Sequence, residues 1–456
     1  RLANFYWTVV ISDCLFYLCY IYRYYPKQTM KKFRIHIEEL GPIKNADITL
    51  APVMIFTGAS NLGKSYTNFL AYYIFNLFSG DRLKDFIRTK VTEDMEAQKE
   101  FNFSFTIDEL KLWMEEDVKK FFVYLLNYPG IPCRIQFYPE EDTESKFTVK
   151  YSERIPDFVT EAPKGLELTT VNINNEAHYI YVLQSIDKIQ GICDSTSRYL
   201  CNELLGRDIS HAYLLPPGRA SLLNESYSTQ AQSSKIGMYD IFLKDFDLIN
   251  NRRMKDIQKT NRQTTNTKTA KIRKMINGEV NNKKEGLTLK INEQTELPLS
   301  AAASSIRELS PVILWMQTDN LSNDSMCIEE PEAHAHPEMQ YSIADLLTSC
   351  INEGALMQIT THSDYFLARL NLLIKLDKVK QNNPEAFEVF CKKNGWDNNL
   401  TLDGSLVEAY YFHTDNVGYA VKVERMNAEK GIPFSTFEKA VQEQIEWSDF
   451  LEDIEK

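Results

Sequence analysis

One stretch of the sequence decides the fold: Gly58-Ala59-Ser60-Asn61-Leu62-Gly63-Lys64-Ser65. It follows a short apolar run, Val53 to Thr57, of the kind that forms a buried strand. Apolar residues at helical spacing begin soon after it, at Phe69. A glycine, four residues, then glycine, lysine and serine between a strand and a helix is the pattern of a phosphate-binding loop. The alternative is a chance glycine-rich turn. The strand before the segment and the helix after it disfavour that alternative.

Each residue type in this loop has a physical role. The glycines let backbone N–H groups turn toward a phosphate, helped by the positive end of the following helix. Lys64 supplies a positive charge to the β- and γ-phosphates, and the Ser65 hydroxyl is a ligand for Mg²⁺. We therefore expect residues 58–65 to bind ATP together with Mg²⁺.

Two adjacent acids, Glu329 and Glu330, follow a second apolar run at residues 325–328. Neighbouring residues of a strand face opposite ways, so two acids at a strand tip can have separate roles. We expect Glu329 to hold the metal ion through water and Glu330 to orient or deprotonate the attacking water. The alternative is a solvated acidic turn, which the phosphate-binding loop elsewhere in the chain disfavours.

A third apolar run, Ala355 to Thr360, leads into His362. A histidine at a strand end beside a triphosphate can contact the γ-phosphate, so we predict a catalytic role for His362, although a lone histidine is usually structural. His334 and His336 could share a metal ion, but no third and fourth ligands stand at suitable spacing. We expect these two to shape a turn before a helix that begins at Pro337.

The segment Leu299 to Leu309 combines small residues, two hydroxyl groups and the start of a helix. We expect Ser304 and Ser305 to cap this helix and to present N–H and O–H donors to an anion. Taken alone, the segment would be an ordinary helix N-terminus.

Composition and charge place the chain among ordinary globular proteins. It has 456 residues, 43% apolar and 25% charged, enough for two or three domains. The net charge of −12 disfavours binding of nucleic acid over most of the surface. Residues 252–284 are a local exception with eleven Lys and Arg, either a DNA-binding surface or a solvated, partly disordered linker. The eight cysteines lack CxxC spacing, which predicts reduced thiols in a cytoplasmic protein and no zinc site.

The first 29 residues differ from the rest of the chain. Leu2 to Tyr22 is mostly apolar and long enough to cross a bilayer, but it carries Asn4 and Asp13. Met30 is followed at once by a strand-like pattern, so we expect the native fold to start there, with no membrane association. A membrane anchor is the alternative.

The patterns divide the remaining chain into five parts. We expect the first half of a nucleotide-binding head over residues 30–80 and an inserted lobe over 81–205. The head continues over 206–251 and is interrupted by a basic polar insertion at 252–285. Its second half occupies residues 286–456.

In this order the segments resemble the ABC-type ATPase heads of the SMC, RecF and OLD group, and above all the OLD-like AAA-domain proteins of bacteria. The resemblance covers residues 31–456, apart from the lobe and the basic stretch. It implies an α/β P-loop NTPase with an antiparallel β subdomain and a mainly helical inserted lobe. The features that carry it are the Phe33–Leu50 hairpin with Gly41-Pro42-Ile43, the phosphate-binding loop, Glu329 to His334 with His336-Pro337, Thr360 to Ser363, and the proline–arginine element Leu214 to Arg219.

The resemblance implies an ATPase that forms a head-to-head homodimer around two ATP molecules. Ser304 and Ser305 would then touch the γ-phosphate bound by the partner subunit. The chain departs from the group in two places: Ser305 is followed by Ile306 rather than glycine, and Glu329 stands where many ABC ATPases have aspartate. The residues after His362 contain no Asp-x-Asp pair, so we expect no Toprim nuclease there.

Three functions stay open from the sequence. The first is a slow ATPase that acts as a conformational switch on a separate effector, such as a nuclease in anti-phage defence. The second is a RecF-like DNA-binding maintenance ATPase that uses residues 252–284. The third is a pseudo-ATPase scaffold, which binds nucleotide with little turnover.

Overall fold

The computed structural model forms two compact units. The smaller one holds residues 1–35, 73–119 and 136–211, and the larger one holds 36–72, 120–135 and 212–456. Of the prefix 1–29, the structure describes residues 6–10, which form a strand that pairs in parallel with residues 178–182. The expected start of the fold at Met30 stays a prediction. The residues that the structure describes are 6–10, 30–153, 166–174, 176–183, 188–223, 236–260, 267–283, 286–415, 421–433 and 447–448.

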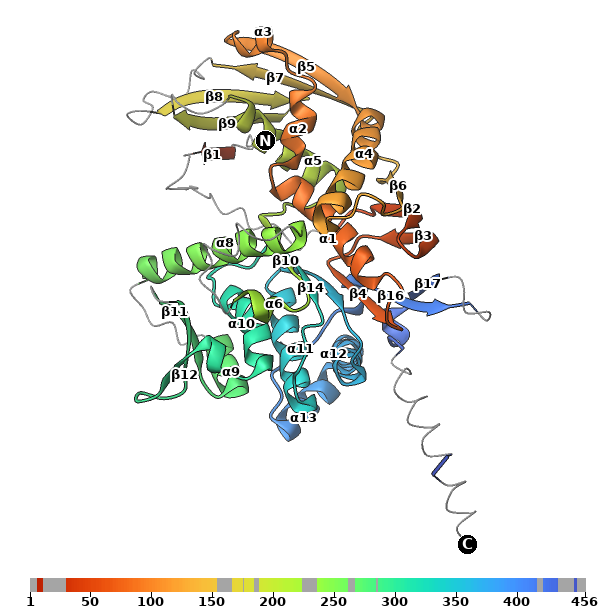
Figure 1. The fold of residues 1–456 in the computed structure, drawn as a ribbon, viewed down its shortest axis with the longest axis vertical. Coiled ribbons are helices and arrows are strands. Elements are labelled where there is room, and N and C mark those ends of the chain that lie inside the picture. Colours follow the sequence, from red (N-terminus) through yellow and green to blue (C-terminus); the bar gives the residue numbers. More distant parts are fainter. Residues whose placement is uncertain are drawn as a thin grey trace. The chain divides into compact units, whose positions relative to one another are not determined.

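The larger unit is built on a nine-stranded sheet (Figure 1). Its central strands β14, β15, β4 and β16 run parallel, and β17 is antiparallel to β16. The expected α/β fold with an antiparallel part is therefore confirmed. In order across the sheet the strands are β10 (His211–Leu215), β14 (Asp324–Glu329), β15 (Leu356–Thr360), β4 (Val53–Gly58), β16 (Val407–Thr414), β17 (Val421–Met426), β3 (Ile43–Thr49), β2 (Arg34–Leu40) and β6 (Cys133–Tyr138).

Strand β4 lies at the centre of the parallel part. All six of its residues are buried, which explains why the run reads as continuously apolar rather than alternating. The register pairs Glu329 of β14 with Thr360 of β15, Thr360 with Phe56 of β4, and Gly58 of β4 with Phe412 of β16. The carboxyl ends of these strands thus meet at one edge, where the predicted site residues follow.

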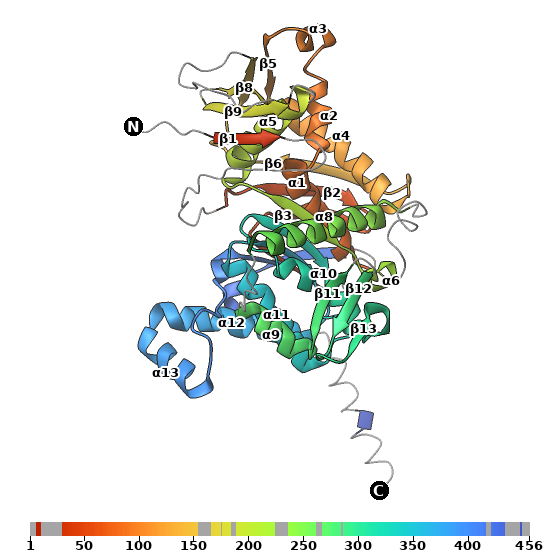
Figure 2. The ribbon, with the colours of Figure 1, turned by 90° about the vertical axis from the view of Figure 1, so that its left-hand side faces the viewer.

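Helices pack beside this sheet, α8 against α10 and α11 against α12 (Figures 1 and 2). Apolar side chains of β4, β14, β15 and these four helices form one continuous core. The helices are α1 (Lys64–Ser79), α6 (Arg219–Leu222), α8 (Gly237–Thr260), α9 (Thr267–Ile276), α10 (Ser304–Met316), α11 (Pro337–Asn352), α12 (Asp364–Asn382) and α13 (Pro384–Asn394), with 3-10 turns η1 (Leu299–Ala301), η2 (Gly404–Leu406) and η3 (Ala428–Lys430).

A small antiparallel sheet lies on the chain between α9 and α10, made of β11 (Glu279–Lys283), β12 (Gly286–Lys290) and β13 (Glu296–Pro298). The sequence predicts a basic polar insertion over 252–285, and this boundary stays a prediction. The described residues of the stretch lie in α8, α9, β11 and the turn between α9 and β11, within the larger unit. Ile272, Ile276 and Val280 of this stretch contribute to the core.

The smaller unit contains a five-stranded sheet beside helices, where the lobe was expected to be mainly helical. Buried and exposed residues alternate along β5 and β7, so one face of each strand packs inward. No helix within the described ranges is long and apolar enough to span a membrane. The strands, in sheet order, are β1 (Tyr6–Val10), β9 (Glu176–Leu183), β8 (Leu166–Ile173), β7 (Lys146–Ser152) and β5 (Glu100–Thr106), and the helices are α2 (Arg82–Arg88), α3 (Glu93–Glu96), α4 (Ile107–Leu126) and α5 (Lys188–Leu205).

Candidate nucleotide-binding site

The phosphate-binding loop connects β4 to α1, as the sequence predicts. Gly58 has φ 117°, and a Cβ there would lie 2.1 Å from the carbonyl oxygen of Phe412. That same oxygen accepts a hydrogen bond from the Ala59 N–H at 3.1 Å. Only glycine fits at position 58, because strand β16 comes too close for any side chain. Gly63 also has positive φ, 92°, and a Cβ there would meet the side chain of Ile43 on β3.

Lys64 is the buried cation of the site. It is 5% exposed, and its Nζ donates to the carbonyl oxygens of Gly58 at 3.1 Å and Ala59 at 2.6 Å. Burial lowers the pKa of Lys64 to about 8, although the negative charges of Glu330 and Glu329 act in the opposite direction. The ammonium group is thus held inside the loop that is expected to surround the phosphates.

Ser65 and Glu329 lie together, although they are 264 positions apart in the chain. The Ser65 hydroxyl donates to Glu329 Oε2 at 2.5 Å, and the Asn68 side-chain amide donates to Glu329 Oε1 at 2.7 Å. Glu329 is 3% exposed, and burial raises its pKa, against the effect of these two hydrogen bonds. A hydroxyl and a carboxylate are the oxygen donors that Mg²⁺ prefers, so this pair fits the expected metal.

Asn68 is a site residue that the sequence reasoning missed. It lies three residues after Ser65 on α1, which puts both side chains on one face of the helix. Asn68 is fully buried among apolar residues of α1. A polar residue inside the apolar helix pattern, one turn beyond the loop, was the signal that could have identified it.

Glu330 is placed differently from its neighbour Glu329. Its side chain is 47% exposed, and its Oε1 lies 3.7 Å from Nε2 of His362. Its φ of 43° is a left-handed conformation that is rare for residues other than glycine. The Glu330 N–H donates to the carbonyl oxygen of Thr360 at 3.1 Å. The two acids thus face separate surroundings, one toward Ser65 and one toward His362, as their different predicted roles require.

His362 follows β15 and is one-third exposed. Burial and the charge of Lys64 lower the pKa of His362, while Glu330 acts to raise it. The structure therefore brings together Lys64, Ser65, Glu329, Glu330 and His362 at one edge of the sheet.

Ser304 and Ser305 begin α10 but do not cap it. The N-cap is Ala303, whose methyl group cannot accept a hydrogen bond, so the predicted capping role is wrong. The Ser304 hydroxyl instead accepts a hydrogen bond from Arg307 at 3.1 Å. The expected contact of Ser304 and Ser305 with a nucleotide concerns a second subunit and stays a prediction.

His336 caps α11, as the sequence predicts for the turn before Pro337. Its Nδ1 accepts from the backbone N–H of Glu338 at 3.4 Å. Within the described ranges, no group of three or more His, Cys, Asp or Glu side chains could hold a metal ion. The six cysteines that the structure describes are free and buried.

Arg219 belongs to the proline–arginine element, for which the sequence predicts no specific role. The residue is 1% exposed. Its guanidinium donates to three carbonyl oxygens: that of Glu308 at 2.7 Å, that of Glu329 at 2.8 Å and that of Pro216 at 3.0 Å. Its Nε also lies 3.5 Å from the Glu308 carboxylate. Arg219 therefore connects α10, one turn after Ser304, with the end of β14.

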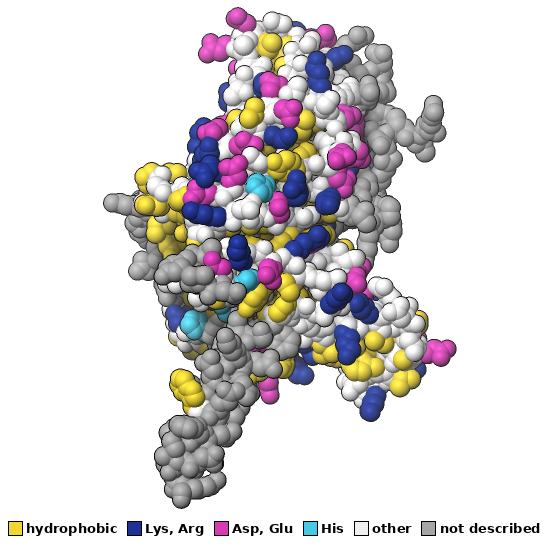
Figure 3. All heavy atoms as spheres, turned by 90° about the vertical axis from the view of Figure 1, so that its right-hand side faces the viewer, with side chains coloured by type: hydrophobic (Ala, Val, Ile, Leu, Met, Phe, Trp, Pro, Cys, Tyr) yellow, Lys and Arg dark blue, Asp and Glu magenta, His cyan; other side chains and the backbone are white. Residues whose placement is uncertain are grey.

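Five of the eleven basic residues in the stretch 252–284 form ion pairs with carboxylates of the protein itself. A cation that is paired in this way is less available to nucleic acid phosphates. Figure 3 shows a different face of the molecule, on which basic and acidic side chains are interspersed. The pairs in this stretch are Arg252–Asp324, Lys268–Glu353, Lys271–Asp397, Arg273–Glu279 and Lys283–Glu296.

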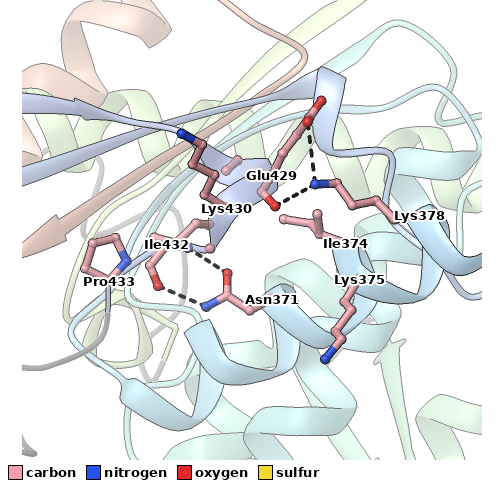
Figure 4. A pocket seen from close by; sticks show the side chains of 10 residues that line it. Asn371, Ile374, Lys375, Lys378, Glu429, Lys430, Ile432 and Pro433 are labelled. Atoms are coloured by element: carbon pink, nitrogen blue, oxygen red, sulfur yellow. Dashed lines mark hydrogen bonds and ion pairs between the residues drawn. The ribbon is translucent and has the colours of Figure 1, made fainter.

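A cavity of about 630 Å³ lies between α12 and η3 (Figure 4). Three lysines line it, Lys375, Lys378 and Lys430, but Lys378 is already bound to the carbonyl oxygen of Glu429 at 2.7 Å and faces its carboxylate. None of the lining residues belongs to the site at the ends of β4, β14 and β15.

Comparison with known protein families gives one match. Residues 220–367 match the family model of the AAA ATPase domain. This ATPase-domain stretch includes Ser304, Ser305, Glu329, Glu330 and His362, and the phosphate-binding loop precedes it along the chain. The ATPase resemblance predicted from the motifs is confirmed at this level. No curated protein matches the chain.

Solved structures of SMC head domains are similar to the chain at low identity. An SMC head bound to the C-terminal winged-helix domain of ScpA has 12% identity and a TM-score of 0.37, over 88% of this chain and 98% of that one. The SMC head from Pyrococcus furiosus with an extended coiled coil, bound to the C-terminal domain of ScpA, has 11% identity and a TM-score of 0.37, over 94% and 100%. The SMC head from Thermotoga maritima has 10% identity and a TM-score of 0.34, over 87% and 99%.

Proposed function

We propose that this protein is an ATP-hydrolysing molecular switch that dimerises head to head around ATP and controls a separate effector. The observation that carries the ATPase part is the contact between Ser65 and Glu329, beside the buried Lys64. A hydroxyl from the phosphate-binding loop and a carboxylate from a neighbouring strand are brought together where ATP-hydrolysing enzymes hold Mg²⁺.

The site residues divide the chemistry among them. Lys64 and the N–H groups of residues 59–63 bind the phosphates and align the γ-phosphate for attack. Mg²⁺ held by Ser65 and Glu329 would neutralise charge on the β- and γ-phosphates. Glu330 orients the attacking water and accepts its proton, because it is the more exposed of the two acids at the strand end.

His362 has a second role at the γ-phosphate. Its ring lies next to Glu330, so it can donate a hydrogen bond to a γ-phosphate oxygen while Glu330 binds the water. When the γ-phosphate leaves, that hydrogen bond is lost. His362 thereby reports whether ATP or ADP is bound, which a switch requires.

The dimer is proposed from the position of Ser304 and Ser305 at the start of α10. Ala303 leaves the first N–H groups of this helix without a side-chain cap, so they can donate to an anion on a second subunit. The resemblance to OLD-like proteins suggests that the effector is a separately encoded protein, such as a nuclease in anti-phage defence.

Calorimetry and a phosphate-release assay on the purified protein test the proposal. We expect ATP to bind with Mg²⁺ and to be hydrolysed slowly, and light scattering to show a dimer with ATP–Mg²⁺ but not with ADP. ATP binding without any single-turnover hydrolysis would favour a scaffold instead of a switch. Absence of ATP binding would overturn the proposal.

A further inference from the structure

The loop after β14 and the loop after β15 are joined by a buried carboxylate that the mechanism above does not use. Glu332 Oε1 accepts two hydrogen bonds, from the Thr361 hydroxyl at 2.5 Å and from the His362 N–H at 3.1 Å. Glu332 is 7% exposed. Both donors come from the three-residue segment that carries the His362 ring, so the carboxylate fixes the backbone at His362.

A second contact joins the same loops. The Gln340 amide, on α11, donates to the carbonyl oxygen of Ala335 at 2.9 Å and accepts from the Ser363 hydroxyl. Residues 332–335 are thus attached to residues 361–363 on both sides of His362. With the hydrogen bonds of both Glu332 and Gln340 in place, neither loop can shift by itself without breaking a hydrogen bond.

The carboxylate of Glu332 is costly to bury, which argues against a chance contact. Burial raises its pKa to about 7, and its Oε2 has no hydrogen-bond partner among the described residues. Burying an acid with one unpaired oxygen costs free energy of folding, so a contribution to stability does not explain its presence here. An amide or a hydroxyl could close the same loop at lower cost if stability were the only requirement.

The backbone at Glu330 shows what the attachment maintains. Its left-handed φ of 43° persists only where the surrounding structure enforces it. Pro331 separates Glu330 from Glu332, so fixing Glu332 also restricts Glu330, and the Glu330 N–H is held by Thr360 from the other strand. The 3.7 Å distance between Glu330 Oε1 and His362 Nε2 therefore depends on the two loops keeping their relative position.

We propose that Glu332 is a positioning residue that holds His362 against Glu330 for the hydrolysis step. This inference rests on the proposed ATPase function. Glu332 contacts neither the phosphate-binding loop nor Ser65 in the hydrogen bonds above, so it sets the geometry of hydrolysis and leaves ATP binding to Lys64.

The test compares Glu332→Ala and Glu332→Gln with a control, Glu338→Ala, at an exposed glutamate in the first turn of α11. Alanine removes the acceptor, so we expect kcat to fall between about tenfold and a hundredfold, since small misplacements of reacting groups have effects of that size. The dissociation constant for ATP should change less than about threefold, because residues 58–65 are untouched. Glutamine keeps one acceptor oxygen and should recover most of kcat, and Glu338→Ala should match the wild type.

The outcomes separate this inference from the function on which it rests. A wild-type protein that hydrolyses ATP, with unchanged kcat in Glu332→Ala, would overturn the positioning role alone. Loss of ATP affinity together with kcat in both Glu332 variants would show a structural role and would also overturn it. A wild-type protein that neither binds nor hydrolyses ATP would overturn the proposed function, and this inference with it.

Discussion

The Arg219 guanidinium donates a hydrogen bond to the backbone carbonyl oxygen of Glu329, 2.8 Å away. The same guanidinium holds the carbonyl oxygen of Glu308 on α10. One buried cation thus contacts both the end of β14, which carries Glu329, and the helix that starts at Ser304. Arg219 is therefore a direct physical connection between α10 and the backbone of Glu329.

Replacing Arg219 should destabilise the fold strongly. Arg219→Ala leaves the Glu308 carboxylate buried without its partner, an effect of about 3–5 kcal/mol on the free energy of unfolding. Arg219→Lys should not restore stability, because an ammonium group cannot reach three carbonyl oxygens as a planar guanidinium does. Urea unfolding measures both. The exposed Arg134→Ala, which breaks an ion pair with Glu39 on the surface, should cost no more than about 1 kcal/mol, and equal losses at both sites would contradict this account.

Lys64→Ala should weaken ATP binding by about a hundredfold, because the loop loses its cation at the β- and γ-phosphates. Isothermal calorimetry with ATP–Mg²⁺ measures the change. Lys44→Ala is the matched control, since Lys44 is a 73% exposed lysine on the neighbouring hairpin. An unaltered dissociation constant for Lys64→Ala would remove residues 58–65 from the nucleotide site.

Glu330→Gln and Glu329→Gln should have different effects. Glu330→Gln should leave ATP binding intact and slow hydrolysis on the order of a hundredfold, because the amide cannot accept the proton of water. Glu329→Gln should instead raise the Mg²⁺ concentration needed for half-maximal turnover, since it removes a negative charge that holds the metal ion in place. Single-turnover assays over a Mg²⁺ titration separate the two. The assignment of roles is wrong if Glu329→Gln keeps both the metal dependence and the rate.

Ser304→Arg combined with Ser305→Arg should prevent the ATP-dependent dimer. The hydroxyl residues at the start of α10 are small enough for a second subunit to approach, and two arginines would hold the faces apart. ATP binding by each monomer should survive because residues 58–65 are unchanged. Light scattering on the Glu330→Gln background, with and without ATP–Mg²⁺, gives the result. A double variant that still dimerises would exclude this helix end from the interface.

Asp245 on α8 should make stability depend on pH. Its carboxylate accepts from the Leu214 N–H at 2.7 Å and the Tyr72 hydroxyl at 3.4 Å, and desolvation raises its pKa from 3.8 to about 8. The folded state therefore holds this proton more tightly than the unfolded state. The stabilisation is complete below about pH 4 and is lost as pH rises through 8.

Asp245→Asn, which cannot ionise, tests this dependence. Its melting temperature relative to the wild type should rise from pH 5 to pH 8. The exposed Glu385→Gln serves as control and should show a constant difference across the same range. A constant difference for Asp245→Asn would show that its carboxyl does not titrate in this window.

The site residues that the structure brings together stand at the ends of apolar runs. Lys64 and His362 follow β4 and β15, and Glu329 ends β14. The carboxyl ends of parallel strands meet at one edge of a sheet, so the proximity of these residues could be expected. Asn68, Glu332 and Arg219 could not be found this way. Their partners are backbone groups or single oxygens far along the chain, and no local pattern encodes such a pairing.

The basic stretch shows that ion pairs, too, cannot be predicted from the sequence alone. Its composition indicated exposed cations, yet Lys268 pairs with Glu353, 85 positions later. A sequence shows the number of charges but not which of them are neutralised across the fold. Order in this region follows from its buried isoleucines, which were present in the sequence but were outweighed there by the surrounding polar residues.

The contact between Ala59 and Phe412 has a consequence during synthesis of the protein. Strand β4 leaves the ribosome early, while its neighbours β15 and β16 are made some 300 to 350 residues later. At roughly 5–20 residues per second, β4 waits about 20–70 s for β16. Throughout that time β4 lacks both of its neighbours in the finished sheet, and its unpaired edges are open to pairing with other chains.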